Sequence, residues 1–103
     1  MEHFFVGKEY YLGDSGEVCN NEKDVIRLHN ECYIAIHKLG LQALKHNAWK
    51  GTDDQIPTGC SVRQPSELGG MEIDFYFEIT SHGLGTGRND LRPVCIKPEN
   101  TGF

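Results

Sequence analysis

The stretch that decides the fold is residues 71–80, Met-Glu-Ile-Asp-Phe-Tyr-Phe-Glu-Ile-Thr, in which apolar and polar side chains alternate. One side of it carries the apolar residues Met71, Ile73, Phe75, Phe77 and Ile79. The other side carries Glu72, Asp74, Tyr76, Glu78 and Thr80. Because successive side chains of a strand point to opposite faces, this pattern predicts a β-strand with one buried face. A one-sided strand favours an antiparallel sheet, with the acidic face toward water or a partner.

A helix that could cover the buried face is predicted earlier in the chain. Apolar residues recur there at spacings of three and four, which is typical of an amphipathic helix: Val25, Leu28, Cys32, Ala35, Ile36 and Leu39. Asn20 or Asn21 can cap its start, and Gly40 can end it in a left-handed conformation. We therefore expect the helix over about Lys23 to Leu39.

Three shorter apolar segments can supply paired strands: Phe4 to Leu12, Cys60 to Arg63 and Pro93 to Lys97. The predicted fold class is therefore α+β, with one main amphipathic helix packed on a small antiparallel sheet of three to five strands. A chain of 103 residues holds one such core, so we expect a single domain over residues 1–103.

Composition bounds the class of protein and its partners. The chain is 38% hydrophobic and 24% charged, which predicts a soluble globule rather than a disordered or membrane protein. Its net charge of −5 argues against a nucleic-acid partner, which requires a clustered basic surface. No run approaches the roughly 20 apolar residues of a spanning helix, so we expect no direct membrane insertion. Phe4-Phe5-Val6 is too short for a signal-peptide core, so we expect a mature or a cytosolic chain.

The four cysteines, Cys19, Cys32, Cys60 and Cys95, lie far apart and form no CxxC zinc or redox pattern. Their even number favours two disulfides, with buried free thiols as the alternative. Three pairings are formally possible. We expect Cys32 to pair with Cys60, because Cys32 lies on the helix stripe that should face the sheet. Cys19 then pairs with Cys95 and ties the N-terminal segment to the last strand.

Short motifs also follow one another in a fixed order: Asn30-Glu31-Cys32 with Ala35, Leu39-Gly40-Leu41, Trp49-Lys50-Gly51, Pro57-Thr58-Gly59-Cys60, Phe75-Tyr76-Phe77 and Arg92-Pro93-Val94-Cys95. In this order the chain resembles a small cysteine-paired module that recurs in predicted secreted proteins of diatoms and other marine protists. The resemblance covers about residues 19–97. Where that module commonly has an Asn after the aromatic strand, this chain has Glu78. The resemblance implies disulfides and a non-cytosolic location, and it implies no agreed chemistry.

No residue pattern indicates catalysis, a metal site or a cofactor. No serine has a nucleophile-elbow context, no carboxylate pair is singled out by spacing, and an even cysteine count leaves no thiol nucleophile. His29 and His37 would lie about 80° apart around a helix, unlike a metal-binding i, i+4 pair. The glycine-rich residues 83–87 lead into a strand rather than a helix, which argues against a phosphate loop. We expect them to form a connection in which Arg88 pairs with Asp90.

Surface recognition is the function that these arguments leave. Long loops on a rigid sheet often carry binding residues, and two predicted loops, residues 49–58 and 82–92, flank the central strand. The predicted partner surface consists of Trp49, Asp53, Asp54, Tyr76, Glu78, Arg88 and Asp90. We expect an extracytosolic binding or structural module for a protein or glycan, secreted or in an organelle lumen. The alternatives are an accessory subunit on the lumenal or external side of a membrane complex, and a small hydrolase.

Overall fold

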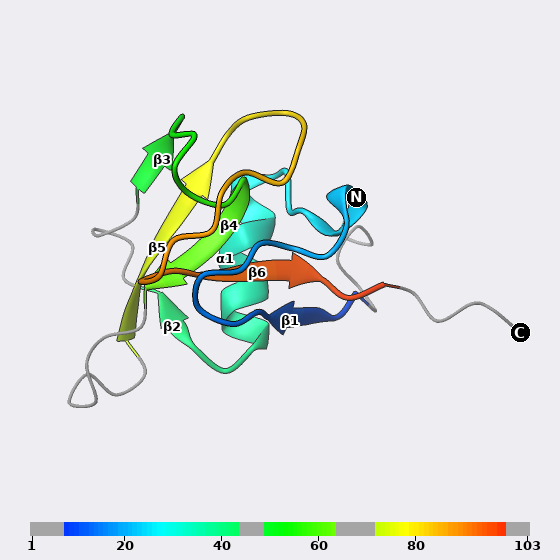
Figure 1. The fold of residues 1–103 in the computed structure, drawn as a ribbon. Helices are drawn as coiled ribbons and strands as arrows, with labels where there is room; N and C mark the ends of the chain where they lie inside the picture. Colours follow the sequence, from blue (N-terminus) through cyan, green and yellow to red (C-terminus); the bar gives the residue numbers. More distant parts are fainter. Residues whose placement is uncertain (1–7, 44–48, 64–71, 99–103) are drawn as a thin grey trace, which may run out of the picture.

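The computed structural model describes residues 8–43, 49–63 and 72–98, in which one helix packs on a mixed β-sheet (Figure 1). The elements in chain order are β1 (Tyr10–Leu12), the 3-10 helix η2 (Glu22–Asp24), α1 (His29–Lys38), β2 (Gln42–Ala43), β3 (Trp49–Gly51), β4 (Gly59–Arg63), β5 (Glu72–Glu78) and β6 (Arg92–Ile96). The α+β class predicted from the sequence is confirmed, as is the strand predicted at 71–80, of which residues 72–78 form β5.

The sheet follows the order β1-β6-β4-β5-β2, and β3 also pairs with β5. The pairs β1–β6, β6–β4 and β4–β5 are antiparallel, as predicted. β2 and β3 pair with β5 in parallel, so the sheet is mixed rather than wholly antiparallel. The topology explains this difference. β3 and β4 run in opposite directions, and β5 lies between them, so a strand antiparallel to β4 is necessarily parallel to β3.

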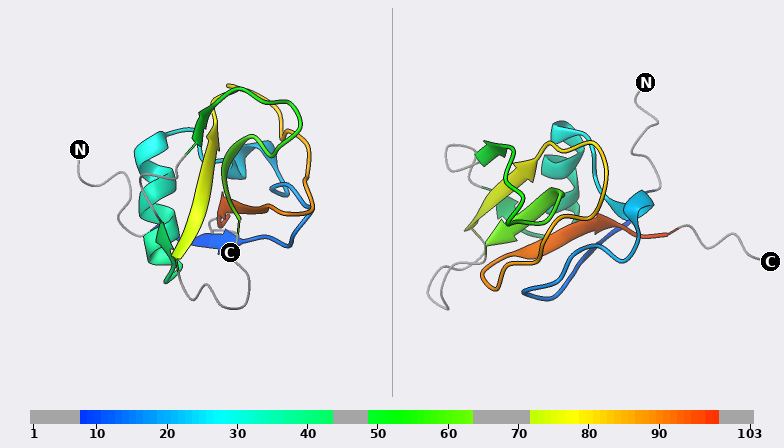
Figure 2. Two further views of the ribbon diagram at one scale, coloured as in Figure 1. Left: turned by 90° about the vertical axis from the view of Figure 1, so that its left-hand side faces the viewer. Right: turned by 45° about the horizontal axis from the view of Figure 1, so that its top comes forward.

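The main core lies between α1 and the sheet. Phe75 and Phe77 of β5 are buried there, as the alternation predicts, and the ring of His29 at the start of α1 packs on both. Figure 2 shows α1 on one side of β4 and β5, with residues 79–91 passing on the other side. The buried residues of this core are Tyr10, Ile26, Cys32, Ala35, Ile36, Cys60, Val62, Phe75, Phe77 and Val94. We call the sheet face opposite α1 the outer face.

The helix is shorter than predicted at its start. Residues 22–24 form a single 3-10 turn, and the backbone is extended at Val25 and again at Leu28, before α1 begins at His29. Val25 makes a β-bridge to Cys95 of β6, and Ile26 is fully buried. The apolar spacing that suggested two further helical turns therefore arises from an extended segment that also buries apolar side chains.

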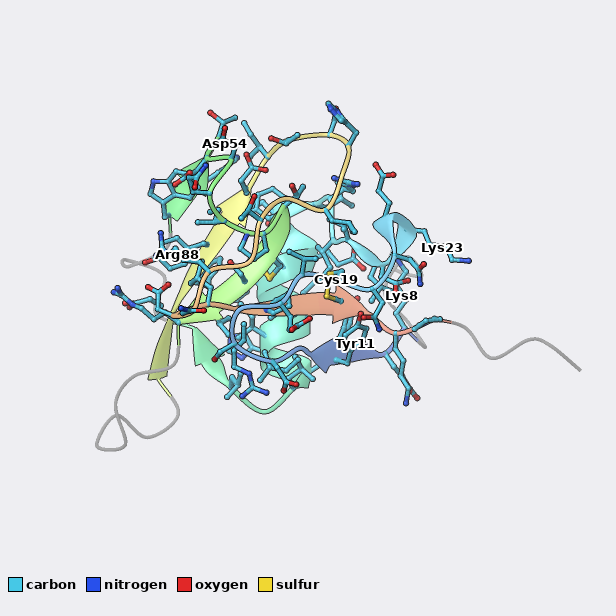
Figure 3. All side chains as sticks on the ribbon, in the orientation of Figure 1. Lys8, Tyr11, Cys19, Lys23, Asp54 and Arg88 are labelled. Carbon is cyan, nitrogen blue, oxygen red and sulfur yellow. A yellow bond between two sulfur atoms is a disulfide. The ribbon has the colours of Figure 1, made fainter. Side chains whose placement is uncertain are left out.

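Both predicted disulfides are present. Cys32 bonds to Cys60 with an S–S distance of 2.00 Å, and this bridge lies in the core beneath α1. Cys19 bonds to Cys95 at 2.03 Å and packs with Val25 in a second, smaller cluster (Figure 3). The bridges thus fasten two separate apolar clusters of one domain.

A buried carboxylate ties β1 to α1. Glu31 is only 3% exposed, and its Oε2 accepts hydrogen bonds from the Tyr10 hydroxyl at 2.9 Å and from Lys8 Nζ at 3.1 Å. Burial raises the pKa of the Tyr10 hydroxyl well above its usual range, and the hydrogen bond to the Glu31 carboxylate raises it further. This network satisfies a charge that would be costly to bury alone.

Candidate functional site

Two aromatic rings lie next to each other on the outer face. Trp49 of β3 and Tyr76 of β5 are paired in the sheet register, and residues paired in this way point to the same side. Their ring centroids are 6.2 Å apart and the ring planes are tilted by 44°. Both side chains are half-buried. The outer face therefore presents two adjoining aromatic surfaces.

An arginine from the connection after β5 packs on the Tyr76 ring. The guanidinium carbon of Arg88 lies 5.7 Å from the centroid of the Tyr76 ring, within the range of a cation–π interaction. Arg88 also forms the predicted pair with Asp90, donating from Nε to Oδ1 at 2.6 Å and from Nη2 to Oδ2 at 3.0 Å. These hydrogen bonds hold the pKa of Asp90 below its usual range. The two-point pairing fixes the orientation of the guanidinium plane over Tyr76.

A second ion pair stands on the same face. Arg63 Nη2 at the end of β4 donates to Asp74 Oδ2 of β5 at 2.7 Å. The side chains of both pairs remain partly exposed, at 46% and 24% for Arg63 and Asp74 and at 38% and 43% for Arg88 and Asp90. A ligand can therefore reach all four. We call Trp49, Arg63, Asp74, Tyr76, Arg88 and Asp90 together the outer-face patch.

The two predicted loops are joined to each other. The Thr58 N–H donates to the Leu84 carbonyl and the Thr86 N–H to the Ile56 carbonyl, both at 3.1 Å, which makes a β-bridge between Pro57 and Gly85. Gly85 has φ +77°, and a Cβ atom there would lie 2.6 Å from the Ile56 carbonyl oxygen. Only glycine allows this approach. The loops therefore form one unit rather than two independent surfaces.

The expectation that Glu78 faces a partner is wrong. Its side chain lies on the outer face, but it is only 2% exposed, because the residues after β3 and β5 fold over it. Its carboxylate accepts the Asp53 N–H at 3.0 Å, the Thr80 N–H at 3.0 Å and the Thr80 hydroxyl at 2.7 Å. Burial alone would raise the pKa of Glu78, but these hydrogen bonds outweigh it and lower the pKa. Glu78 is a structural residue that holds the loop in place.

Asp53 and Asp54 are not brought into the patch. Asp53 Oδ1 accepts the Gln55 N–H at 2.9 Å and so closes its own turn. Asp54 is exposed, accepts a hydrogen bond from the Gln55 side chain at 3.0 Å, and lies apart from Arg88 in Figure 3. Of the seven residues predicted from the sequence, four come together: Trp49, Tyr76, Arg88 and Asp90.

Sequence reasoning missed Arg63, and it placed Asp74 only on the acidic face of the strand without assigning it to the partner surface. Arg63 at the end of β4 and Asp74 within β5 are visible as polar residues, but the antiparallel register that makes them opposite residues is not. In the part of the chain that the structure describes, no cluster of three or more His, Cys, Asp or Glu side chains could hold a metal ion. No helix in these same ranges is long and apolar enough to cross a membrane.

No protein-family model matches this chain, and comparison with curated proteins and with solved structures gives no significant match. The functional argument therefore depends on the structure itself, on the geometry of the outer face and on the two disulfides.

Proposed function

We propose that this domain is an extracytosolic binding module that recognises its ligand through the outer-face patch. The observation that carries the proposal is the half-exposed Tyr76 ring, whose centroid lies 6.2 Å from that of Trp49 and 5.7 Å from the Arg88 guanidinium carbon. Trp, Tyr and Arg are the residue types that contribute most binding energy at recognition surfaces. Here the Trp49 ring and the Arg88 guanidinium both lie next to Tyr76.

The patch is also held in place before a ligand arrives. Arg88 is oriented by two hydrogen bonds to Asp90, and the loop that carries both is bridged to the loop after β3 through Gly85. A side chain that is already ordered loses less conformational entropy when it binds, which leaves more of the contact energy for affinity. This arrangement supports recognition over a purely connecting role for the loop.

The location rests on the disulfides. Such bonds form and persist in oxidising compartments and are rare in the cytosol. Both bridges join segments that are distant in the sequence, with separations of 76 and 28 residues. A secreted protein, or one in an organelle lumen, is the protein class that uses such bridges to stabilise a small domain.

The test compares immobilised wild-type domain with Tyr76→Ala and Arg88→Ala for retention of material from the extracellular fraction of the source cells. Lys23→Ala is the control, because Lys23 is exposed on η2, away from Arg88 (Figure 3). Thermal midpoints are measured in parallel. We expect both patch variants to lose retention while their midpoints stay above the assay temperature, and Lys23→Ala to keep it. Full retention by both patch variants would show that recognition lies on another face.

A further inference from the structure

We infer that the ligand of the outer-face patch is a neutral glycan, bound by stacking of its pyranose rings on Trp49 and Tyr76. This inference rests on the proposed function and names its ligand class. It comes from three features of the patch: its aromatic surfaces, the internal pairing of its charges, and the kind of hydrogen-bonding groups at its rim.

The aromatic surfaces suit a chain of sugar units. Pyranose rings with equatorial hydroxyls present a face of C–H groups, which packs on the electron-rich face of an aromatic ring. The Trp49 and Tyr76 centroids are 6.2 Å apart, and the two rings are tilted by 44°, so they offer two adjoining platforms rather than one enclosed pocket. Two neighbouring platforms fit successive units of an oligosaccharide.

The charges of the patch favour a neutral ligand. Each arginine is already paired with an aspartate, Arg63 with Asp74 at 2.7 Å and Arg88 with Asp90 at 2.6 Å. An anionic ligand would approach two carboxylates together with two guanidinium groups, and a cationic ligand would meet the same mixture. The whole chain carries a net charge of −5, which further repels polyanionic glycans such as sulfated or uronic acid polymers.

The ion pairs still provide the hydrogen bonds that sugar hydroxyls need. A hydroxyl donates one hydrogen bond and accepts others. A partly exposed arginine–aspartate pair presents N–H donors beside carboxylate acceptors, so two neighbouring hydroxyls of one sugar can each find a partner. Two such pairs lie near Tyr76: Arg88 with Asp90, whose guanidinium packs on the Tyr76 ring, and Arg63 with Asp74, which is two residues before Tyr76 on the same face of β5.

A protein ligand fits the patch less well. Binding hot spots in protein interfaces are surrounded by contacts that exclude water. The large apolar side chains that the described residues leave exposed are Leu28 and Ile79, which belong to the segment before α1 and to the position after β5, outside the patch. The aromatic rings of the patch are instead bordered by charged groups.

The experiment uses the emission of Trp49, which is the single tryptophan of the chain and lies in the patch. The folded domain is titrated with neutral hexasaccharides of β-1,3-glucan, β-1,4-glucan and β-1,4-mannan. Oligogalacturonate and a heparin hexasaccharide are the anionic counterparts. We expect saturable emission changes with at least one neutral oligomer, and at least about tenfold weaker binding of both anionic ones.

The variants separate this inference from the proposed function. Tyr76→Ala and Arg88→Ala should each weaken binding of the neutral oligomer at least about tenfold, which corresponds to about 1.4 kcal/mol, while Lys23→Ala should bind as the wild type does. The glycan assignment is overturned if none of the neutral oligomers binds, or if the anionic oligomers bind as tightly as the neutral ones. If retention of native material still depends on Tyr76 and that material is destroyed by protease, recognition by the patch stands and the ligand is a protein. If retention is independent of Tyr76 and Arg88, the proposed function itself fails.

Discussion

Gly85 offers the sharpest test of how the outer face is assembled, because it carries the bridge between the two loops. Replacing it with alanine places a Cβ atom 2.6 Å from the Ile56 carbonyl oxygen and even closer to the Thr58 nitrogen. The matched control is Gly83→Ala. Gly83 has nearly the same backbone conformation, with φ +80° against +77°, but no atom lies within 4 Å of a Cβ built there.

The two substitutions share one cost and differ in another. Alanine in the left-handed region costs roughly 1–2 kcal/mol, and both variants lose this amount. Gly85→Ala must also move the loops apart and break the hydrogen bonds of Thr58 and Thr86, each of which contributes about 0.5–1.5 kcal/mol. The free energy of unfolding should therefore fall by about 1–2 kcal/mol in Gly83→Ala and by about 2–5 kcal/mol in Gly85→Ala.

Thermal unfolding followed by circular dichroism measures this difference. A loss of 1 kcal/mol lowers the midpoint of a domain of this size by about 4–8 °C, so the midpoint of Gly85→Ala should lie roughly 5–20 °C below that of Gly83→Ala. Native-state hydrogen exchange should show faster exchange of the Thr58 and Thr86 amides in Gly85→Ala alone. Equal midpoints for the two variants, with both amides still protected, would refute the close approach of the loops.

Three further predictions concern groups that hold the fold. Because hydrogen bonds lower the folded-state pKa of Glu78, its stabilising effect is fully present above the unfolded-state pKa near 4.3 and is lost as pH falls below it. In urea unfolding from pH 3 to 7, Glu78→Gln should lower the free energy of unfolding at pH 7 by about 1–3 kcal/mol and make it depend less on pH. The same pH dependence in both proteins would contradict this. Tyr10→Phe removes the hydroxyl that donates a hydrogen bond to Glu31, and it should lower the free energy of unfolding, measured with urea, by about 1–2 kcal/mol. Because the pKa of Tyr10 is raised, Tyr10 should not ionise near pH 10, so the tyrosinate absorbance step at that pH should be equally large in Tyr10→Phe and in the wild type. A smaller step in the variant would mean that Tyr10 titrates normally. Replacing Cys32 and Cys60 together with alanine opens a loop of 28 residues and should destabilise the domain by about 3–4 kcal/mol in chemical unfolding, and an unchanged midpoint would exclude that contribution.

The features that the sequence predicts correctly are those encoded over short distances or by simple counting. Alternation places Phe75 and Phe77 in the core, because strand geometry alone fixes which side chains share a face. The pairing of Cys32 with Cys60 follows from one apolar stripe and one buried strand. The pair formed by Arg88 and Asp90 lies within three residues of chain, so it too could be predicted.

The features that the sequence does not reveal depend on which distant segments meet. Val25 continues a helical spacing, yet it is extended, because pairing with Cys95 of β6 outweighs the local pattern. Glu78 has the outward position that its alternation predicts, but the turn at Asp53 covers it. Arg63 and Asp74 become partners only through the register of β4 and β5. A candidate site built from loops and sheet edges is therefore only partly visible before the fold is known.

The bridge between Cys19 and Cys95 closes a covalent ring, since it joins positions separated by 76 of the chain's 103 residues. Any single peptide-bond cleavage inside this ring yields a two-chain molecule whose pieces stay linked. The pieces then face each other at the high effective concentration of an intramolecular reaction, so they can re-form the sheet instead of diffusing apart. For a protein exposed to proteases, one cut at a surface loop would leave the outer-face patch assembled, and loss of function would require a second cut or reduction of the bridge.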